Sequence, residues 1–263
     1  MNVPTNPLAG RRILVTRPQE RGERLLEQVA KAGGRIFHRP AIDFESPVDP
    51  SSADRAVSEL SSFDWLVLTS PTGLRFFLDR LRDSGRAAVP GTVRFAVVGP
   101  GTADALQDAG YRPDLIPDIA DADGLAAGLS GEPIAGKRVL WVRPETARPA
   151  LGNILEEAGA EVVQAIFYRT VPHTGCPEIG ADLTAGRYHG VLFTSPSTFR
   201  AVFEALPPDR IESFRKVVRV AIGRVTAGAM EAAGYPPHAT AGEPTAEGVA
   251  AAFAAAFGPA PLC

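Results

Sequence analysis

The sequence predicts an α/β protein built from two similar lobes, each a parallel β-sheet covered by helices. Three observations lead to this prediction. The chain of 263 residues repeats itself, short apolar runs alternate with helical stretches, and polar segments follow the apolar runs. A repeat of about 130 residues is long enough to bury a hydrophobic core of its own.

The internal repeat runs through the whole chain. Paired segments are 10–18 with 136–144, 68–71 with 193–196, 98–103 with 222–227, and 109–111 with 233–235. The offset between partners falls from 126 residues to 125 and then to 124. Such a drift is typical of small loop deletions after an internal duplication.

The apolar runs are short and continuous, and helical stretches separate them. We expect strands at 13–15, 65–68, 95–98, 139–141, 191–193 and 218–222, and helices at 21–32, 74–81, 101–109, 121–129 and 246–257. Continuous apolar strands that alternate with helices predict parallel sheets buried on both faces. This is the doubly wound pattern of flavodoxin-like and Rossmann-like domains.

Composition excludes several classes of function. The chain has 27 basic and 30 acidic residues, so no basic excess favours nucleic acid or an anionic membrane. No apolar run is long enough for a signal peptide or a membrane span, and we expect a cytoplasmic protein. Two cysteines and four scattered histidines suggest neither a disulfide framework nor a metal site, and we expect no cofactor.

Polar residues cluster where the predicted strands end and helices begin. In doubly wound sheets, ligands bind at the carboxyl ends of the strands. Helix starts there offer unpaired N–H groups and a partial positive charge, which suits carboxylates or phosphates. The candidate binding residues are Ser70, Pro71, Thr102, Ser195, Pro196, Ser197 and Thr226. The alternative is that each only caps its helix or fills the first turn.

Two glycine-rich patterns fall short of nucleotide motifs. Gly99-x-Gly101-x-x-Asp104 lacks the third glycine of a dinucleotide fingerprint. The stretch ending in Gly136-Lys137-Arg138 has arginine where a P-loop needs a hydroxyl for magnesium, and it precedes a strand. The sequence therefore predicts neither a nicotinamide site nor a P-loop.

Taken in order, these segments resemble those of the uroporphyrinogen-III synthases. The matching pieces are 14–18, 64–71, 98–103, 168–170, 191–197 and 221–227, which span nearly the whole chain. The resemblance implies two lobes joined by a two-stranded connector. The first lobe would comprise 1–38 and 172–263, the second 43–166, and the connector 39–42 and 167–171. Repeat spacing alone would have given two contiguous halves.

The resemblance also implies an activity. The family's substrate is hydroxymethylbilane, a linear tetrapyrrole with eight carboxylates, which loses its hydroxyl and closes with inversion of ring D. We expect it to lie in a cleft between the lobes of a monomer, handed over transiently by hydroxymethylbilane synthase. The arginines expected to bind its carboxylates are Arg17, Arg143, Arg148 and Arg224. The alternative is that each is only a solvated charge on the surface.

Tyr168 is the expected proton donor to the departing hydroxyl, and its partner in the first half of the repeat is Ile42. The alternative is that Tyr168 is a connector tyrosine that packs in the fold and has no catalytic role. Because the bilane also closes unaided to the unflipped isomer, a hundredfold preference needs only about 2.7 kcal/mol of differential transition-state binding. The rival function is a non-catalytic cytoplasmic two-lobed sensor that binds a tetrapyrrole or another acidic metabolite.

Overall fold

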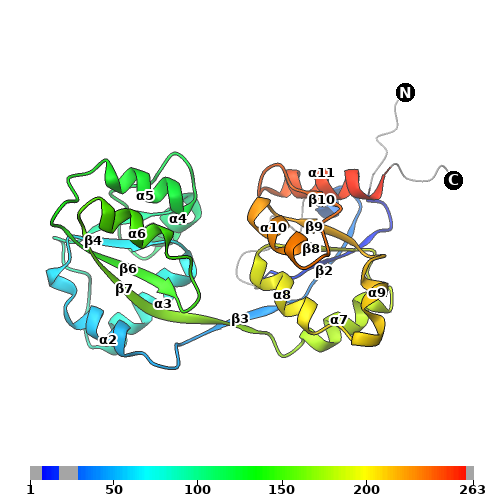
Figure 1. Ribbon diagram of the computed structural model, residues 1–263, viewed down its shortest axis with the longest axis horizontal. Helices are drawn as coiled ribbons and strands as arrows, with labels where there is room; N and C mark the ends of the chain where they lie inside the picture. Colours follow the sequence, from blue (N-terminus) through cyan, green and yellow to red (C-terminus); the bar gives the residue numbers. More distant parts are fainter. Residues whose placement is uncertain (1–7, 18–28, 259–263) are drawn as a thin grey trace. The chain divides into compact units, whose positions relative to one another are not determined.

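The computed structural model describes residues 8–17 and 29–258, and the chain divides into two compact units (Figure 1). The first unit is Met1–Asp43 with Val171–Cys263, and the second is Phe44–Thr170. The chain leaves the first unit within strand β3 (Ile42–Glu45) and returns to it within strand β7 (Glu161–Pro172). The first unit is therefore built from both ends of the chain.

The first unit contains a parallel sheet of order β10-β9-β8-β1-β2. Its strands are β1 (Arg12–Val15), β2 (Arg35–His38), β8 (Gly190–Phe193), β9 (Val218–Ala221) and β10 (Ala239–Thr240). Val15 lies opposite His38 and Leu192, and Phe193 lies opposite Ala221. The carboxyl ends of these strands therefore meet at one edge, the first carboxyl edge.

The second unit contains a sheet of order β3-β7-β6-β4-β5. The strands not yet introduced are β4 (Trp65–Leu68), β5 (Arg94–Val97) and β6 (Arg138–Pro144). Leu68 lies opposite both Val97 and Val142, which defines the second carboxyl edge. Beyond it, the register between β6 and β7 shifts after Arg143, so that Pro144 pairs with Tyr168.

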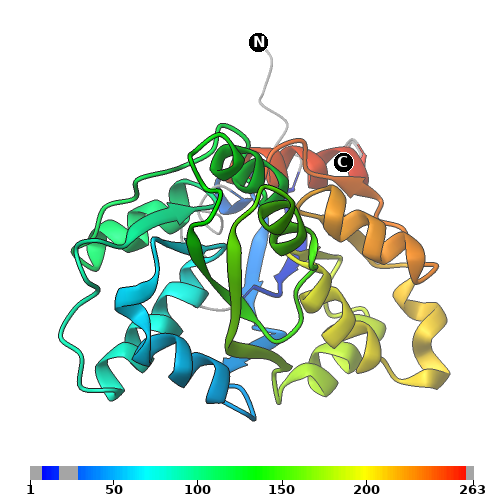
Figure 2. The same cartoon turned by 60° about the vertical axis from the view of Figure 1, so that its left-hand side comes forward.

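Helices cover both faces of the second sheet (Figure 1, Figure 2). They are α2 (Ser51–Ser58), α3 (Pro71–Asp83), α4 (Pro100–Asp108), α5 (Ala122–Ser130) and α6 (Ala150–Glu157), with a 3-10 turn at Leu60–Ser62. Leu66 of β4 packs in one core with Phe77, whereas its neighbour Val67 packs in another with Leu125. Alternate residues of one strand thus meet different helices, which is why the strand is apolar throughout.

The helices of the first unit are α7 (Cys176–Thr184), α8 (Pro196–Glu204), α9 (Ile211–Phe214), α10 (Arg224–Ala232) and α11 (Ala246–Phe257), with a 3-10 turn at Pro208–Arg210. Val249 and Phe253 of α11 pack on Ile13 and Val220 of the sheet. The predicted terminal helix at 246–257 is confirmed. Of the predicted helix 21–32, residues 21–28 lie outside the described residues, and 29–31 are helical. The α/β class with parallel sheets is confirmed.

At the amino ends of the strands, a side chain accepts a hydrogen bond from a backbone amide of the neighbouring strand. In the first unit the acceptor is a histidine Nδ1, and in the second it is an aspartate Oδ2. The pairs are Arg12 N to His189 at 3.0 Å, Arg219 N to His238 at 3.1 Å, Arg138 N to Asp64 at 2.8 Å and Phe95 N to Asp114 at 2.8 Å. The backbone amides at the amino ends of the two sheets are thus bonded by different side chains, histidines in the first unit and aspartates in the second.

His189, His238 and Asp64 lose their acceptor role in different ranges of pH. Burial, helped by nearby arginines, lowers the pKa of His189 and of His238. A hydrogen bond from Lys137, followed by the one from the Arg138 amide, lowers the pKa of Asp64. The histidines must stay neutral for Nδ1 to accept a hydrogen bond, whereas the aspartate accepts as an anion. The first sheet's amino edge is therefore sensitive to mild acid, and the Asp64 contact is not.

Candidate functional site

Within the described residues, each carboxyl edge carries the starts of at least two helices. In the second unit, α3 follows β4 and α4 follows β5, with Ser70 and Gly99 at the N-cap positions. In the first unit, α8 follows β8 and α10 follows β9, with Ser195 and Gly223 at the N-caps. Adjacent parallel strands bring each pair of starts together, so each edge presents unpaired amides and partial positive charge.

Ser70 and Tyr168 meet at the second carboxyl edge. The Oγ of Ser70 accepts a hydrogen bond from the backbone N of Gly73 at 2.9 Å and so caps α3. The same Oγ lies 3.0 Å from the phenolic oxygen of Tyr168, which reaches it from β7. Two residues that the sequence predicts for the site, 98 positions apart, therefore form one hydrogen-bonded pair.

The Tyr168 ring is held firmly. Tyr168 is 6% exposed, and its ring stacks on Phe76 with centroids 5.5 Å apart and meets the edge of Phe44 at 5.7 Å. Burial raises the pKa of Tyr168, and the hydrogen bond with Ser70 opposes this rise only in part. The phenol is consequently neutral near pH 7, which suits a proton donor and not a phenolate base.

The corresponding position in the first unit has different partners. Ser195 caps α8 by accepting from the backbone N of Thr198 at 3.1 Å, and Thr198 Oγ1 accepts from Ser195 N at 3.2 Å, which forms a capping box. In the repeat, Gly73 stands where Thr198 stands, and Tyr168 stands where Ile42 stands. The Ser70 hydroxyl therefore bonds both to its own helix and to a phenol. Among the described residues, the Ser195 hydroxyl bonds only within its own capping box.

Gly73 is the residue that sequence reasoning missed. A Cβ at this position would lie 3.4 Å from Ser70 Oγ and 3.6 Å from Cε1 of Tyr168, so any larger side chain would meet the phenol. The signal was present in the repeat, because the glycine and the tyrosine replace their partners together. Reading the two differences as a pair would have identified the contact.

Two predicted threonines are buried in the first turns of their helices. Thr102 in α4 and Thr226 in α10 are each 3% exposed, and both are the third residue of the helix. Thr16, at the end of β1, is fully buried, and its Oγ1 donates to the carbonyl of Leu192 at 2.8 Å. A role for Thr102 and Thr226 in binding stays a prediction.

Pro71 and Pro196 occupy the first position of α3 and α8, as their sequence context predicts. Ser197, the second residue of α8, is partly buried. These three residues lie at the carboxyl edges beside the caps, and their contact with a ligand stays a prediction.

The four predicted arginines differ in their surroundings. Arg143 at the end of β6 donates to Gln164 Oε1 at 2.7 Å and to the Pro144 carbonyl at 3.2 Å, with its guanidinium 5.2 Å from the Trp141 ring. Arg148 and Arg224 are exposed. Arg17 is partly buried, and its backbone carbonyl accepts from His38 Nε2 at 2.6 Å. Pro18 lies outside the described residues.

Metal-ligating side chains do not gather in the described part of the chain. Within residues 8–17 and 29–258, no group of three or more His, Cys, Asp or Glu side chains could hold a metal ion. The helices described there are also too short or too polar to span a bilayer.

Comparison with known proteins identifies relatives of this chain. The family model described as uroporphyrinogen-III synthase HemD matches residues 23–251. The uroporphyrinogen-III synthase of Synechococcus elongatus is 30% identical over 74% of this chain and 74% of its own, and that of Chlorobaculum parvum is 28% identical over 84% and 89%.

Solved structures share the fold. The chain resembles mutant uroporphyrinogen III synthase from Thermus thermophilus with a TM-score of 0.65 and 21% identity, covering 94% of this chain and 99% of that one. The enzyme from Helicobacter pylori gives 0.59 and 18%, covering 91% and 96%. By the extent of the family match, this chain is a member of the uroporphyrinogen-III synthase family.

Proposed function

We propose that this chain cyclises hydroxymethylbilane to uroporphyrinogen III, with loss of water and inversion of ring D. Membership of the family supports the reaction. The observation that carries the proposal is the buried, neutral Tyr168 phenol beside Ser70 Oγ at the start of α3. It joins a proton donor to a helix start that favours negative charge.

The phenol acts on the departing hydroxyl. As the bond from the terminal carbon to the hydroxyl oxygen breaks, its electron pair stays on oxygen, which takes the Tyr168 proton and leaves as water. Electrons from the adjacent pyrrole nitrogen fill the vacated position and give an azafulvenium cation. Inversion of ring D requires that its carbon already bonded to the chain attack first, after which the old bond from that carbon to its methylene bridge breaks and leaves an azafulvenium on the neighbouring ring. The free α-carbon of ring D then bonds to that methylene and loses its proton, and the phenolate recovers one, so two carbon–carbon bonds form, one breaks and one water is lost.

Ser70 prepares Tyr168 for this step. Because Ser70 Oγ already accepts from the Gly73 amide, its own proton can be donated to the Tyr168 oxygen. That orientation leaves the phenolic proton directed to the substrate, and the same hydrogen bond stabilises the developing phenolate. Ser70 is thus a positioning residue that acts through Tyr168.

The carboxylates of the bilane bind at the helix starts of both units. Each start contributes about 0.3–1 kcal/mol to holding an anion, so several together retain a flexible polyanion despite a net charge of −3. Arg17, Arg143, Arg148 and Arg224 add charge, with Ser70, Pro71, Thr102, Ser195, Pro196, Ser197 and Thr226 lining the same edges.

The wider arrangement belongs to the same proposal. We propose that residues of both carboxyl edges contact the substrate, in lobes that arose by duplication and are joined by residues 39–42 and 167–171. The matching order β9-β8-β1-β2 and β5-β4-β6-β7 supports the duplication. The enzyme acts as a cytoplasmic monomer that receives its unstable substrate directly from hydroxymethylbilane synthase.

An isomer assay tests the activity. Freshly made hydroxymethylbilane is supplied to the purified protein, the product is oxidised, and the type I and type III isomers are separated by chromatography. The proposal predicts an excess of the flipped type III isomer over the protein-free reaction. A protein that binds the bilane but leaves only the type I isomer would instead be a sensor, and the proposed activity would be wrong.

A further inference from the structure

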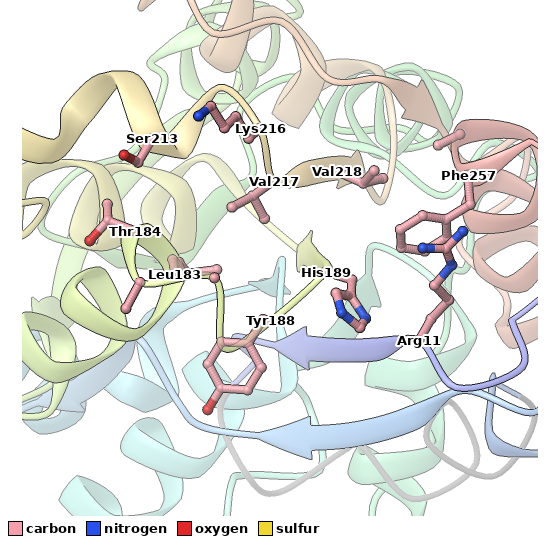
Figure 3. Close-up of a pocket in the computed structure, with 13 residues that line it drawn as sticks. Arg11, Leu183, Thr184, Tyr188, His189, Ser213, Lys216, Val217, Val218 and Phe257 are labelled. Atoms are coloured by element: carbon pink, nitrogen blue, oxygen red, sulfur yellow. The ribbon is translucent and has the colours of Figure 1, made fainter.

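A pocket lies in the first unit, at the end of the sheet opposite the first carboxyl edge (Figure 3). Its volume is about 460 Å³, within the range of small-molecule sites. Arg11 directly precedes β1, His189 directly precedes β8, and Val218 begins β9, so the pocket opens at the strands' amino ends. None of these residues belongs to the carboxyl edges.

The polar side chains of this pocket favour an anion. Among the residues that the structure describes, its lining includes Arg11, Lys216 and His189 and no aspartate or glutamate. Because His189 Nδ1 accepts from the Arg12 amide at 3.0 Å, the ring's proton is on Nε2, which can only donate. Burial and the nearby Arg12 and Arg11 keep that ring neutral by lowering its pKa.

Two acidic groups on the surrounding elements are already paired. Asp182 of α7 bonds to Arg39 at 2.9 Å and to Arg187 at 3.2 Å, and Glu212 of α9 bonds to Arg215 at 3.0 Å. The carbonyls that follow α7 would repel an anion, but the Arg12 guanidinium bonds to those of Gly186 at 3.1 Å and Arg187 at 2.5 Å. Arg11 and Lys216 therefore make the charge of the pocket positive.

The lining also has an apolar part, beside the hydroxyls of Thr184, Tyr188 and Ser213. Phe257 stacks on Phe253 with centroids 5.9 Å apart and lies against Gly190, where an added Cβ would be 3.0 Å from its ring. The Arg11 guanidinium lies 4.7 Å from the centroid of Phe257, so the charge is held beside an aromatic face (Figure 3). Leu183, Val217 and Val218 complete an apolar surface.

We propose that this pocket is a second binding site, for a small molecule with one carboxylate or phosphate group on an aromatic or branched apolar body. Arg11 and the His189 Nε2–H bind the anionic group, and Lys216 adds charge at the rim. Phe257, Val217 and Val218 contact the apolar body. The site makes no use of Tyr168 or the helix starts, so a ligand here would be distinct from the substrate.

Titrations followed by amide NMR on the full chain test this site. Phenyl phosphate is expected to shift the amides of Gly190 and Phe257, and benzoate to shift the same pair, whereas neutral benzyl alcohol and inorganic phosphate bind at least tenfold more weakly. Arg11→Gln should weaken phenyl phosphate about tenfold through loss of a charge-assisted bond. Lys216→Gln should weaken it about threefold, as expected for an exposed charge.

The control is Arg210→Gln, an exposed arginine of the same unit outside the pocket, which should leave the affinity unchanged. Cyclisation by Arg11→Gln should equal that of the wild type. The proposal is overturned if benzyl alcohol or phosphate alone binds as tightly as phenyl phosphate. It is equally overturned if Arg11→Gln and Lys216→Gln bind normally, or if the shifts fall on other residues.

Discussion

Replacing Ser70 by alanine removes both hydrogen bonds of its hydroxyl. The first bond caps α3, and losing such a cap costs about 0.5–2 kcal/mol of stability. The second joins the buried Tyr168 phenol at 3.0 Å, and its loss adds about 0.5–1.5 kcal/mol. Ser70→Ala should therefore lower the free energy of unfolding by about 1–3.5 kcal/mol. It should also reduce kcat about tenfold, since one transition-state hydrogen bond of about 1.4 kcal/mol is lost.

A double-mutant cycle with Tyr168→Phe shows whether Ser70 acts through the phenol. Both tryptophans of the chain, Trp65 and Trp141, are buried in the second unit, so urea unfolding followed by their fluorescence reports on that unit. We expect a coupling of about 1 kcal/mol between the two sites, and a double variant whose kcat is no lower than that of Tyr168→Phe.

Asp121→Ala is the matched control. Asp121 caps α5 in the same unit by accepting from Gly124 N at 2.8 Å, is exposed, and belongs to no part of the proposed site. Its loss should cost a similar cap energy, add to Tyr168→Phe without coupling, and leave kcat unchanged. Additive effects of Ser70→Ala and Tyr168→Phe on both stability and turnover would refute the positioning role.

Three further predictions concern the phenol and the sheet edges. Tyr168→Phe should lower kcat about ten- to a hundredfold with the circular dichroism unchanged, and full turnover would exclude Tyr168 as the acid. Gly73→Thr, which copies the first unit, should displace the phenol and reduce kcat about tenfold, and normal kinetics would contradict the packing argument. Because the folded-state pKa values of His189 and His238 are lowered, stability from their bonds is complete above the unfolded value near 6.5 and falls below it. Hydrogen exchange, corrected for intrinsic rate, should thus show Arg12 and Arg219 amides losing protection from pH 7.5 to 5.5. The Arg138 amide should keep its protection, because the lowered pKa of Asp64 keeps that acceptor charged until the pH falls below 3.8. Equal loss of protection at all three amides would contradict this prediction.

The strands that sequence reasoning identified are those whose burial is continuous. Val67 and its neighbours in β4 are buried on both faces, and such runs stand out as uninterrupted apolar residues. Strand β2 and helix α7 were not predicted from periodicity. In β2, Arg35 is exposed and the other three residues are only partly buried, so the pattern is mixed. The order of the strands depends on long-range pairing that no local pattern encodes.

The candidate site was predictable in part. Ser70 was recognised as a cap from Ser-Pro at a helix start, and Tyr168 from its place in the resemblance. Their contact depends on the register shift after Arg143, which pairs Pro144 with Tyr168. A one-residue irregularity of this kind leaves no local signature, so sequence gave the residues and only the fold shows that they touch.

The proposal that helix starts of both units bind the carboxylates of the substrate is tested most directly by amide NMR with uroporphyrin III, the stable oxidised product. The account predicts that backbone amides at the four helix starts shift together at one saturating ratio of ligand to protein, with Gly73 and Thr102 reporting on one unit and Thr198 and Thr226 on the other. Shifts confined to a single unit, or gathered at the amino ends of the strands, would contradict it.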